Sequence, residues 1–139
     1  MKPIRLIFAG IAMLALAACG TLTPSQAQNA QTALSVAQAT FSTALTLYET
    51  VCSASAGASF CSAGDQAAAV SLEQAAVAAI KVAEAALNNV ASGGTVTSAL
   101  INADVQDAMN AITKFSDFVN ALQAQKMQAR SAAATARAP

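Results

Sequence analysis

Residues 101–122 read INADVQDAMNAITKFSDFVNAL, and this stretch decides the fold. Seven of its apolar residues form a regular row, namely Ile101, Val105, Ala108, Ile112, Phe115, Val119 and Leu122. The intervals between them alternate four and three, which is the spacing of one face of an α-helix. We call such a row of residues a seam. We expect a helix that starts at Thr95 or Thr97 and continues to Arg130, with Lys126 and Arg130 near its negative end.

Two further seams precede this one. The first follows Thr23, a predicted N-cap, and Pro24, and it ends near Cys52. Its members are Ala27, Ala30, Leu34, Ala37, Phe41, Ala44, Tyr48 and Val51. The second is expected to follow a cap at Asp65 and to stop at Gly93-Gly94. Its members are Leu72, Ala76, Ala79, Ala83, Ala86 and Val90, with Ile80 and Leu87 beside them, and Lys81 and Glu84 form an expected outer pair.

Three helices with short connections predict an all-α fold, an up-down-up three-helix bundle over residues 24–130. Residues 131–139 carry no large apolar side chain and are predicted to form a flexible tail. The alternative is three open helices that bury their seams only on oligomerisation. Few large residues lie outside the seams, and a self-contained bundle is therefore the preferred reading. Scattered examples of such residues are Val36, Leu47, Val70, Val77 and Phe118.

Composition limits the classes of function. The 139 residues include 38 alanines, five Phe, one Tyr and no Trp, so the helices should pack closely around few large side chains. Lys and Arg equal Asp and Glu at seven each. Without Lys2 and Arg5 the remainder would carry five basic and seven acidic side chains. Nucleic-acid binding needs clustered Lys and Arg, so no nucleic-acid partner is expected.

Cys52 and Cys61 are two of the three cysteines in the chain. In an exported protein a pair at this spacing predicts a structural disulfide, which would close a loop of about ten residues. A metal site would need further ligands, and the sequence has no His and no second Cys pair. A redox-active pair is usually Cys-x-x-Cys, and eight residues intervene here.

The sequence contains no recognisable catalytic pattern. Histidine, the commonest general base, is absent, and neither Gly-x-Ser-x-Gly nor Ser-x-x-Lys occurs. Asp104 and Asp107 are the only close carboxylate pair, and they are better explained by the positive end of a helix than by a cation. Tyr48 is expected to be a core aromatic. We therefore predict no enzyme activity, no cofactor and no metal site.

Residues 1–18 have the organisation of an export signal. Lys2 and Arg5 form a short positive region, and residues 6–18 are a run of thirteen apolar residues, too short to span a bilayer. The run ends Leu16-Ala17-Ala18-Cys19, followed by Gly20. This sequence resembles the lipobox of bacterial lipoproteins. The alternative is an ordinary secretory signal with a small-residue cleavage site and a Cys placed there by chance.

The lipobox resemblance implies a site of modification. It implies cleavage between Ala18 and Cys19, a diacylglycerol on the Cys19 thiol and an acylated new amino terminus. Residues 19–23 would then be a lipidated tether to the membrane. Gly20 is not the Asp that often retains such proteins in the inner membrane, so the resemblance implies the periplasmic face of the outer membrane.

Three classes of function fit these observations. The first is a lipid-anchored cell-envelope protein with a structural or protein-interaction role. The sequence identifies neither its envelope partner nor its oligomeric state. Phe118 and Leu47 are then the first candidates for a partner surface. The second is a bundle that binds a lipid or another apolar ligand between its helices. The third is a phage-encoded lysis lipoprotein.

Overall fold

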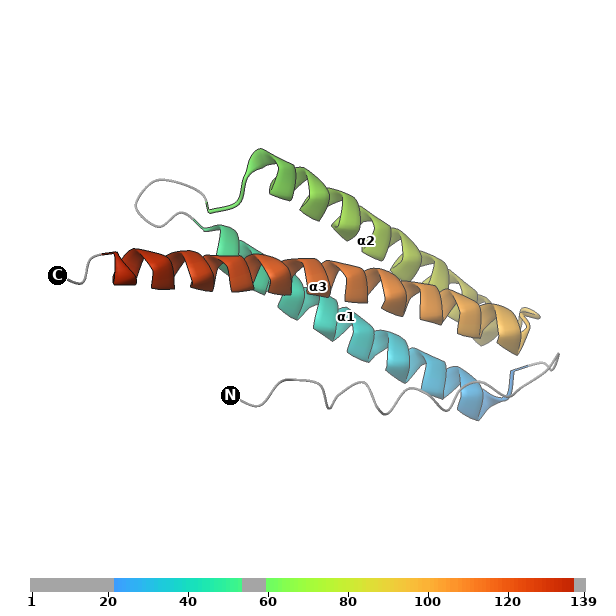
Figure 1. The fold of residues 1–139 in the computed structure, drawn as a ribbon. Coiled ribbons are helices and arrows are strands. Elements are labelled where there is room, and N and C mark those ends of the chain that lie inside the picture. The colour runs from blue at the N-terminus through green and yellow to red at the C-terminus, as the bar shows by residue number, and fades with distance from the viewer. Residues whose placement is uncertain (1–21, 54–59, 137–139) are drawn as a thin grey trace.

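The computed structural model describes residues 22–53 and 60–136, and its elements are three α-helices. Helix α1 comprises Pro24–Cys52, α2 comprises Ala63–Ala91 and α3 comprises Ser98–Thr135. They alternate in direction, so that α1 and α3 run parallel and α2 runs opposite to both (Figure 1). The predicted all-α, up-down-up three-helix bundle is confirmed.

The start of α1 is fixed by a capping box. The side chain of Thr23 accepts a hydrogen bond from the backbone N–H of Gln26 at 3.3 Å, and the Gln26 side chain accepts one from the Thr23 N–H at 2.9 Å. Pro24 follows the cap, where its missing N–H costs no helical hydrogen bond. The predicted bounds of this helix, Thr23 as N-cap and an end at Cys52, are confirmed.

The cap of α2 differs from the prediction. Ser62 is the N-cap, and Asp65 is the third residue of a capping box. The Ser62 hydroxyl accepts from the Asp65 N–H at 3.1 Å, while the Asp65 carboxylate accepts from the Ser62 N–H at 2.9 Å. Both residue types cap helices well, but the earlier one allows two helix N–H groups to be satisfied at once.

The predicted stop of α2 at Gly93-Gly94 is confirmed. Gly93 has φ +85°, a left-handed conformation that favours glycine. Its N–H donates to the Val90 carbonyl at 3.0 Å, and the Gly94 N–H donates to the Asn89 carbonyl at 2.9 Å. These two bonds make a Schellman motif, which satisfies carbonyls that the helix end would otherwise leave unpaired.

Helix α3 begins where the sequence predicted and ends later. Thr97 is its N-cap and accepts from the Leu100 N–H at 3.3 Å. The helix continues to Thr135 rather than ending near Arg130. Residues 131–135 are therefore helical, not an irregular tail, although all of them are exposed. Ala has the highest helix propensity, which extends the helix without any packing. Residues 137–139 lie outside the described part of the chain.

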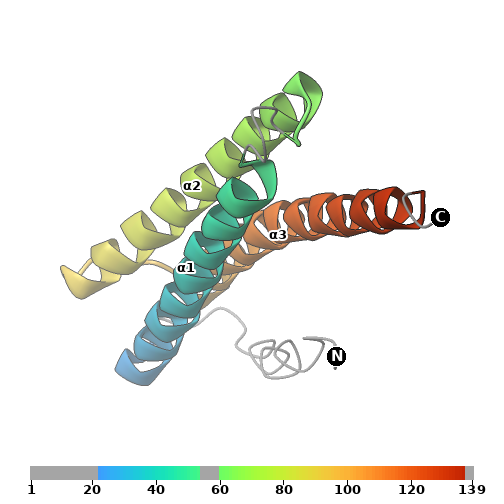
Figure 2. The same ribbon diagram turned by 90° about the vertical axis from the view of Figure 1, so that its left-hand side faces the viewer.

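Helix α3 is the central element of the core. All seven residues of its predicted seam are buried, and Phe115, Ile101 and Val119 are the largest side chains with almost no exposure. Phe115 packs edge-to-face against Phe41 of α1 with ring centroids 5.4 Å apart. Helix α3 packs along both other helices, whereas α1 and α2 contact each other much less. The far end of α3 diverges from the other two helices (Figure 2).

The seams of α1 and α2 are confirmed to different degrees. In α1 every predicted seam residue is buried except Ala27 and Tyr48, which are half-buried. In α2 the predicted seam residues Ala76 and Ala83 are buried, and so are Ile80 and Leu87, which were expected beside the seam. The buried residues are Ala69, Ala76, Ile80, Ala83 and Leu87, and the predicted Leu72, Ala79, Ala86 and Val90 lie at the edge of the core. Because α2 has small apolar residues on every side, its pattern locates the helix but not the buried face.

The arrangement gives the molecule two distinct ends (Figure 1). At one end α1 begins, α2 stops and α3 begins, and we call this the tether end because residues 19–23 precede it. At the other end α1 stops and α2 begins, and we call this the disulfide end. Helix α3 continues past the disulfide end, and its residues 123–135, beyond the last buried residue Leu122, form what we call the arm.

Candidate functional site

The predicted lipidation and cleavage residues, Cys19 and Ala18, lie outside the described residues, as does the whole of residues 1–21. The structure does fix where the folded part of the chain starts. Helix α1 begins at Pro24, five positions after Cys19. Five residues span at most about 18 Å when fully extended. A lipid on Cys19 would therefore hold the tether end within that distance of a bilayer.

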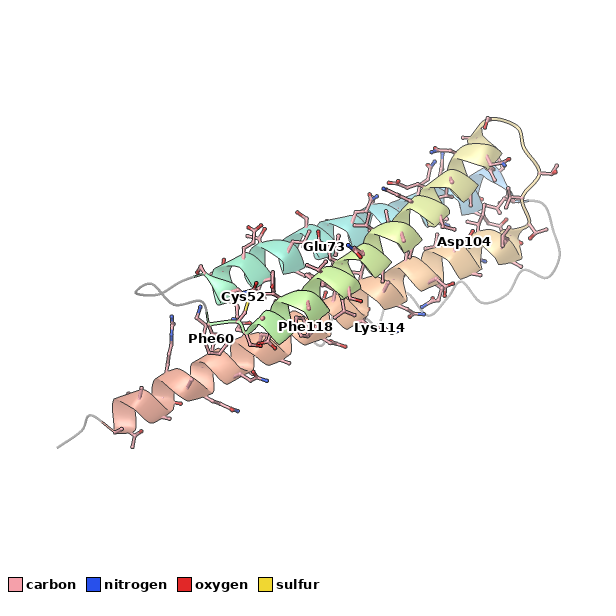
Figure 3. All side chains as sticks on the ribbon, turned by 90° about the horizontal axis from the view of Figure 1, so that it is seen from above. Cys52, Phe60, Glu73, Asp104, Lys114 and Phe118 are labelled. Carbon is pink, nitrogen blue, oxygen red and sulfur yellow. A yellow bond between two sulfur atoms is a disulfide. The ribbon has the colours of Figure 1, made fainter. Side chains whose placement is uncertain are left out.

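The tether end carries no charged side chain. Residues 22–48 and 85–103 contain no Asp, Glu, Lys or Arg, and the fold brings the start of the first range and the whole of the second together at this end. The nearest charged residues along α2 and α3 are Glu84 and Asp104. Each lies about 9–11 Å from the end of its helix at 1.5 Å per residue, and Asp104 is seen near this end in Figure 3.

At the disulfide end, Cys52 and Cys61 form the predicted disulfide. Cys52 is the last residue of α1, and Cys61 lies just before the cap of α2, with their Cα atoms 5.0 Å apart. Cys61 is buried and Cys52 half-buried. The bond thus joins two helix ends directly, and residues 54–59 of the intervening loop lie outside the described chain.

A second, smaller core surrounds this disulfide. Val51, Cys61 and Leu122 are its buried members. Half-buried side chains pack around them, namely Leu47, Tyr48, Cys52, Phe60 and Phe118. Figure 3 labels one residue from each of the three chain segments that meet here: Cys52 of α1, Phe60 just before α2 and Phe118 of α3. Leu47 and Phe118 are therefore accounted for by intramolecular packing, and they are poor candidates for an outward-facing partner surface.

Lys126 connects α3 to the end of α1. Its ammonium group donates hydrogen bonds to the backbone carbonyls of Thr50, at 3.1 Å, and of Val51. The same nitrogen lies 5.8 Å from the centre of the Phe60 ring, within range of a cation–π contact. The last carbonyls of a helix lack partners and carry partial negative charge, which a cation stabilises. Lys126 thus acts on the end of α1 and not, as predicted, on the end of its own helix.

Two titratable groups near the disulfide end, Tyr48 and Asp65, have shifted pKa values. Burial raises the pKa of the Tyr48 hydroxyl, and the negative charges of Asp65 and Glu73 raise it further. Tyr48 lies beside Phe115 with ring centroids 6.3 Å apart, as expected for an aromatic at the edge of the core. Hydrogen bonds from the Ser62 side chain and backbone lower the pKa of Asp65. Both shifts have causes in packing or capping.

The acidic pair of α3 is placed differently from the prediction. No acidic residue occupies the first turn of α3, so Asp104 and Asp107 lie beyond the part of the helix where its dipole acts strongly. Within residues 22–53 and 60–136, no group of three or more potential ligands could hold a metal ion. Nor does any described helix have the length and apolar character needed to cross a membrane.

A shallow groove of about 190 Å³ lies between α1 and α2. Leu34 and Leu87 line it together with polar residues, which are Gln31, Ser35, Gln38, Glu84 and Asn88. The Gln38 side-chain amide donates to the Glu84 carboxylate at 2.6 Å across the two helices. This is the contact that Glu84 makes instead of the predicted pair with Lys81. Small-molecule sites usually enclose about 300–1,000 Å³ and are mostly apolar, so the groove does not favour an apolar ligand.

Several of these contacts were not predicted from the sequence. Ser62 could have been recognised, because Ser followed by Asp three positions later is a capping-box pattern. The Lys126 contacts join residues 75 and 76 positions apart, and the Gln38–Glu84 bond joins residues 46 positions apart. No local pattern announces pairs at such separations.

Comparison with protein-family models, curated proteins and solved structures finds no match to this chain.

Proposed function

We propose that this chain is a lipid-anchored protein of the cell envelope with a structural or protein-interaction role and no catalysis. The observation that carries the proposal is the sequence Leu16-Ala17-Ala18-Cys19, placed five positions before the first helix. The thiolate of Cys is the side chain best suited to alkylation, and small neighbours give a peptidase access to the backbone. Two or three acyl chains satisfy the requirement for stable membrane attachment.

The arm supports the interaction role. Thirteen residues of α3 follow Leu122, corresponding to about 20 Å of helix. Apart from Lys126, whose contacts return to the disulfide end, the side chains of residues 123–135 are exposed. Met127 is 58% exposed, which is high for a large apolar residue. A helix that leaves its bundle presents a surface that a second helix or groove can cover.

Metabolic labelling with a fatty acid tests the anchor. Cells expressing the full chain are expected to incorporate label into the protein, and Cys19→Ser is expected to abolish it. The matched control is the double variant Cys52→Ser/Cys61→Ser, which removes the other two thiols and should stay labelled. Mass spectrometry of the amino-terminal peptide identifies the acyl groups. An unmodified mature terminus at residue 19 in the wild-type protein would contradict the proposal.

Site-specific crosslinking tests the interaction role. A photoreactive amino acid replaces Met127 in the arm or, as control, Val82 on α2, which is 55% exposed. We expect a discrete adduct with one envelope protein from position 127 and none from position 82. Equal, diffuse labelling from both positions would argue against a specific partner on the arm.

A further inference from the structure

Besides the lipobox sequence, three surfaces of the described residues are candidates for binding a ligand, a partner or a membrane. The groove between α1 and α2 is small and partly filled by the Gln38–Glu84 hydrogen bond. The outer face of α1 is rich in threonines whose hydroxyls donate to the carbonyl four residues earlier, as at Thr40 and Thr43, and nothing indicates its occupant. The tether end differs from both, because the position of Cys19 limits what it can meet.

We infer that the tether end rests directly on the bilayer, so that the bundle stands end-on with the disulfide end away from the lipid. This inference rests on the proposed acylation of Cys19. Residues 19–23 cannot extend beyond about 18 Å, whereas α1 alone is about 43 Å long at 1.5 Å per residue. The short connection keeps the beginning of α1 close to the headgroups, and with it the parallel start of α3.

The charge distribution favours contact at this end. The uncharged zone is about 9–11 Å deep along α2 and α3, measured from their ends to Glu84 and Asp104. That depth is comparable to the 5–10 Å that an interfacial helix penetrates into the boundary of headgroups and acyl chains. Moving a charged side chain into this layer is costly, and the tether end has none to move.

Internal hydrogen bonds of the backbone at the tether end also suit a poorly hydrated layer. Capping bonds satisfy part of the backbone groups at the helix ends, through Thr23 in α1, Thr97 in α3 and the Schellman motif at Gly93 and Gly94. Ser92 adds a hydrogen bond from its hydroxyl to the Asn88 carbonyl at 2.6 Å. An unpaired backbone group taken out of water costs free energy, so internal pairing lowers the cost of approaching lipid.

Leu100 supplies an apolar contact for the membrane. It lies in the first turn of α3 and is 53% exposed, while the neighbouring Val96 is half-buried. An exposed leucine at the end of an uncharged cap is placed to enter the interfacial layer. The occupant of this end is therefore a phospholipid surface.

Tryptophan fluorescence tests the orientation, because the chain has no Trp of its own. Single substitutions are made at three residues of nearly equal exposure, Leu100→Trp at the tether end, Val36→Trp on α1 and Met127→Trp on the arm. The acylated proteins are reconstituted into vesicles of phosphatidylethanolamine and phosphatidylglycerol containing a lipid with a quenching group near its headgroup. A second reporter at the tether end, Ala99→Trp, guards against a local defect caused by Leu100→Trp.

We expect vesicles to shift the emission of Leu100→Trp and Ala99→Trp to the blue and quencher lipid to reduce it, leaving Met127→Trp and Val36→Trp unchanged. Flotation of the same samples reports attachment separately. Protein that floats with vesicles but shows no quenching at either tether-end position would overturn the orientation and leave the anchor intact. Equal quenching of Val36→Trp would place α1 flat on the membrane and also overturn it. Wild-type protein without acyl mass that fails to float would refute the proposed function itself.

Discussion

Lys126 supplies hydrogen-bond donors to the last turn of α1, where carbonyls have no partners within the helix. Replacing it by Met keeps the length of the side chain but removes the charge and the donors. We expect Lys126→Met to lower the free energy of unfolding by about 1 kcal/mol, because the group is only half-buried. Urea denaturation measures the change. Lys114→Met, at an exposed position on α3, is the control and should change stability by much less.

Ser116 has the opposite effect on stability. Its hydroxyl oxygen is buried and has no hydrogen-bond partner among the described residues. Ser116→Ala removes this unpaired group and improves helix propensity, so we expect a gain of about 1 kcal/mol in the free energy of unfolding. Ser42→Ala on the exposed face of α1 measures the propensity effect alone. If both substitutions raise the melting temperature equally, the buried hydroxyl is not destabilising.

Asp65 makes stability depend on pH. Its hydrogen bonds from Ser62 lower its pKa in the folded state below the ordinary value of 3.8. A lowered folded-state pKa stabilises the fold above pH 3.8 and loses this effect as the pH falls through the folded-state value. The melting temperature of Asp65→Asn should therefore lie below that of the wild type at neutral pH and approach it as the pH falls below 3.8. Asp107→Asn, at an exposed position on α3, should show no comparable convergence.

At the scale of elements, the stop of α2 can be tested with three glycines. At Gly94 an added Cβ would lie 2.9 Å from the Asn89 carbonyl oxygen and closer still to the Asn89 side chain, and Gly93 has φ +85°. We expect Gly93→Ala and Gly94→Ala each to cost about 1 kcal/mol or more. Gly64→Ala is the matched control in the first turn of α2, where the nearest atom is the Ser62 Oγ at 3.6 Å. It should instead stabilise by about 0.5–1 kcal/mol, as circular dichroism melts would show.

The sequence predicted the elements to different accuracy for identifiable reasons. The seam of α3 is made mostly of the large residues Ile, Val, Phe and Leu, and every predicted seam residue is buried. The seam of α2 is mostly Ala among other Ala, and of its six predicted members only Ala76 and Ala83 are buried. The end of α3 was predicted too early, because periodicity reports packing and the last residues are helical without packing.

At the scale of the whole molecule, the disulfide compensates for a core rich in alanine. Replacing both cysteines by serine should lower the free energy of unfolding by about 2.5–3 kcal/mol, since the bond restricts the unfolded chain. Urea denaturation of the double variant Cys52→Ser/Cys61→Ser measures the cost. A dithiol reductant should destabilise the wild type by a similar amount and leave the variant unchanged. Reductant sensitivity of the double variant would show that another effect is being measured.

The candidate sites were also predicted with unequal success, depending on whether their residues are close in sequence or are brought together by the fold. The export signal and the short spacing together predicted the Cys52–Cys61 pair, because the two residues are close in sequence and flank a turn. The disulfide-end core, by contrast, is assembled from Val51, Cys61 and Leu122, and only the fold reveals that the third helix reaches it. Cys19 is of another kind, since its predicted modification would depend on the flanking sequence rather than on a folded surface. Its modification remains a prediction.

The lengths of α1 and α3 determine how far the tip of α3 would lie from a membrane that holds Cys19. Helix α3 has 38 residues and α1 has 29, so α3 is about 57 Å long against about 43 Å at 1.5 Å per residue. In a molecule fastened by Cys19, the tip of α3 would act as a probe held at a height determined by residue count. Each heptad deleted from the arm would bring that tip about 10 Å closer to the lipid. Binding to a partner held at a fixed height above the lipid would weaken with each deletion. Folding and membrane attachment would stay the same.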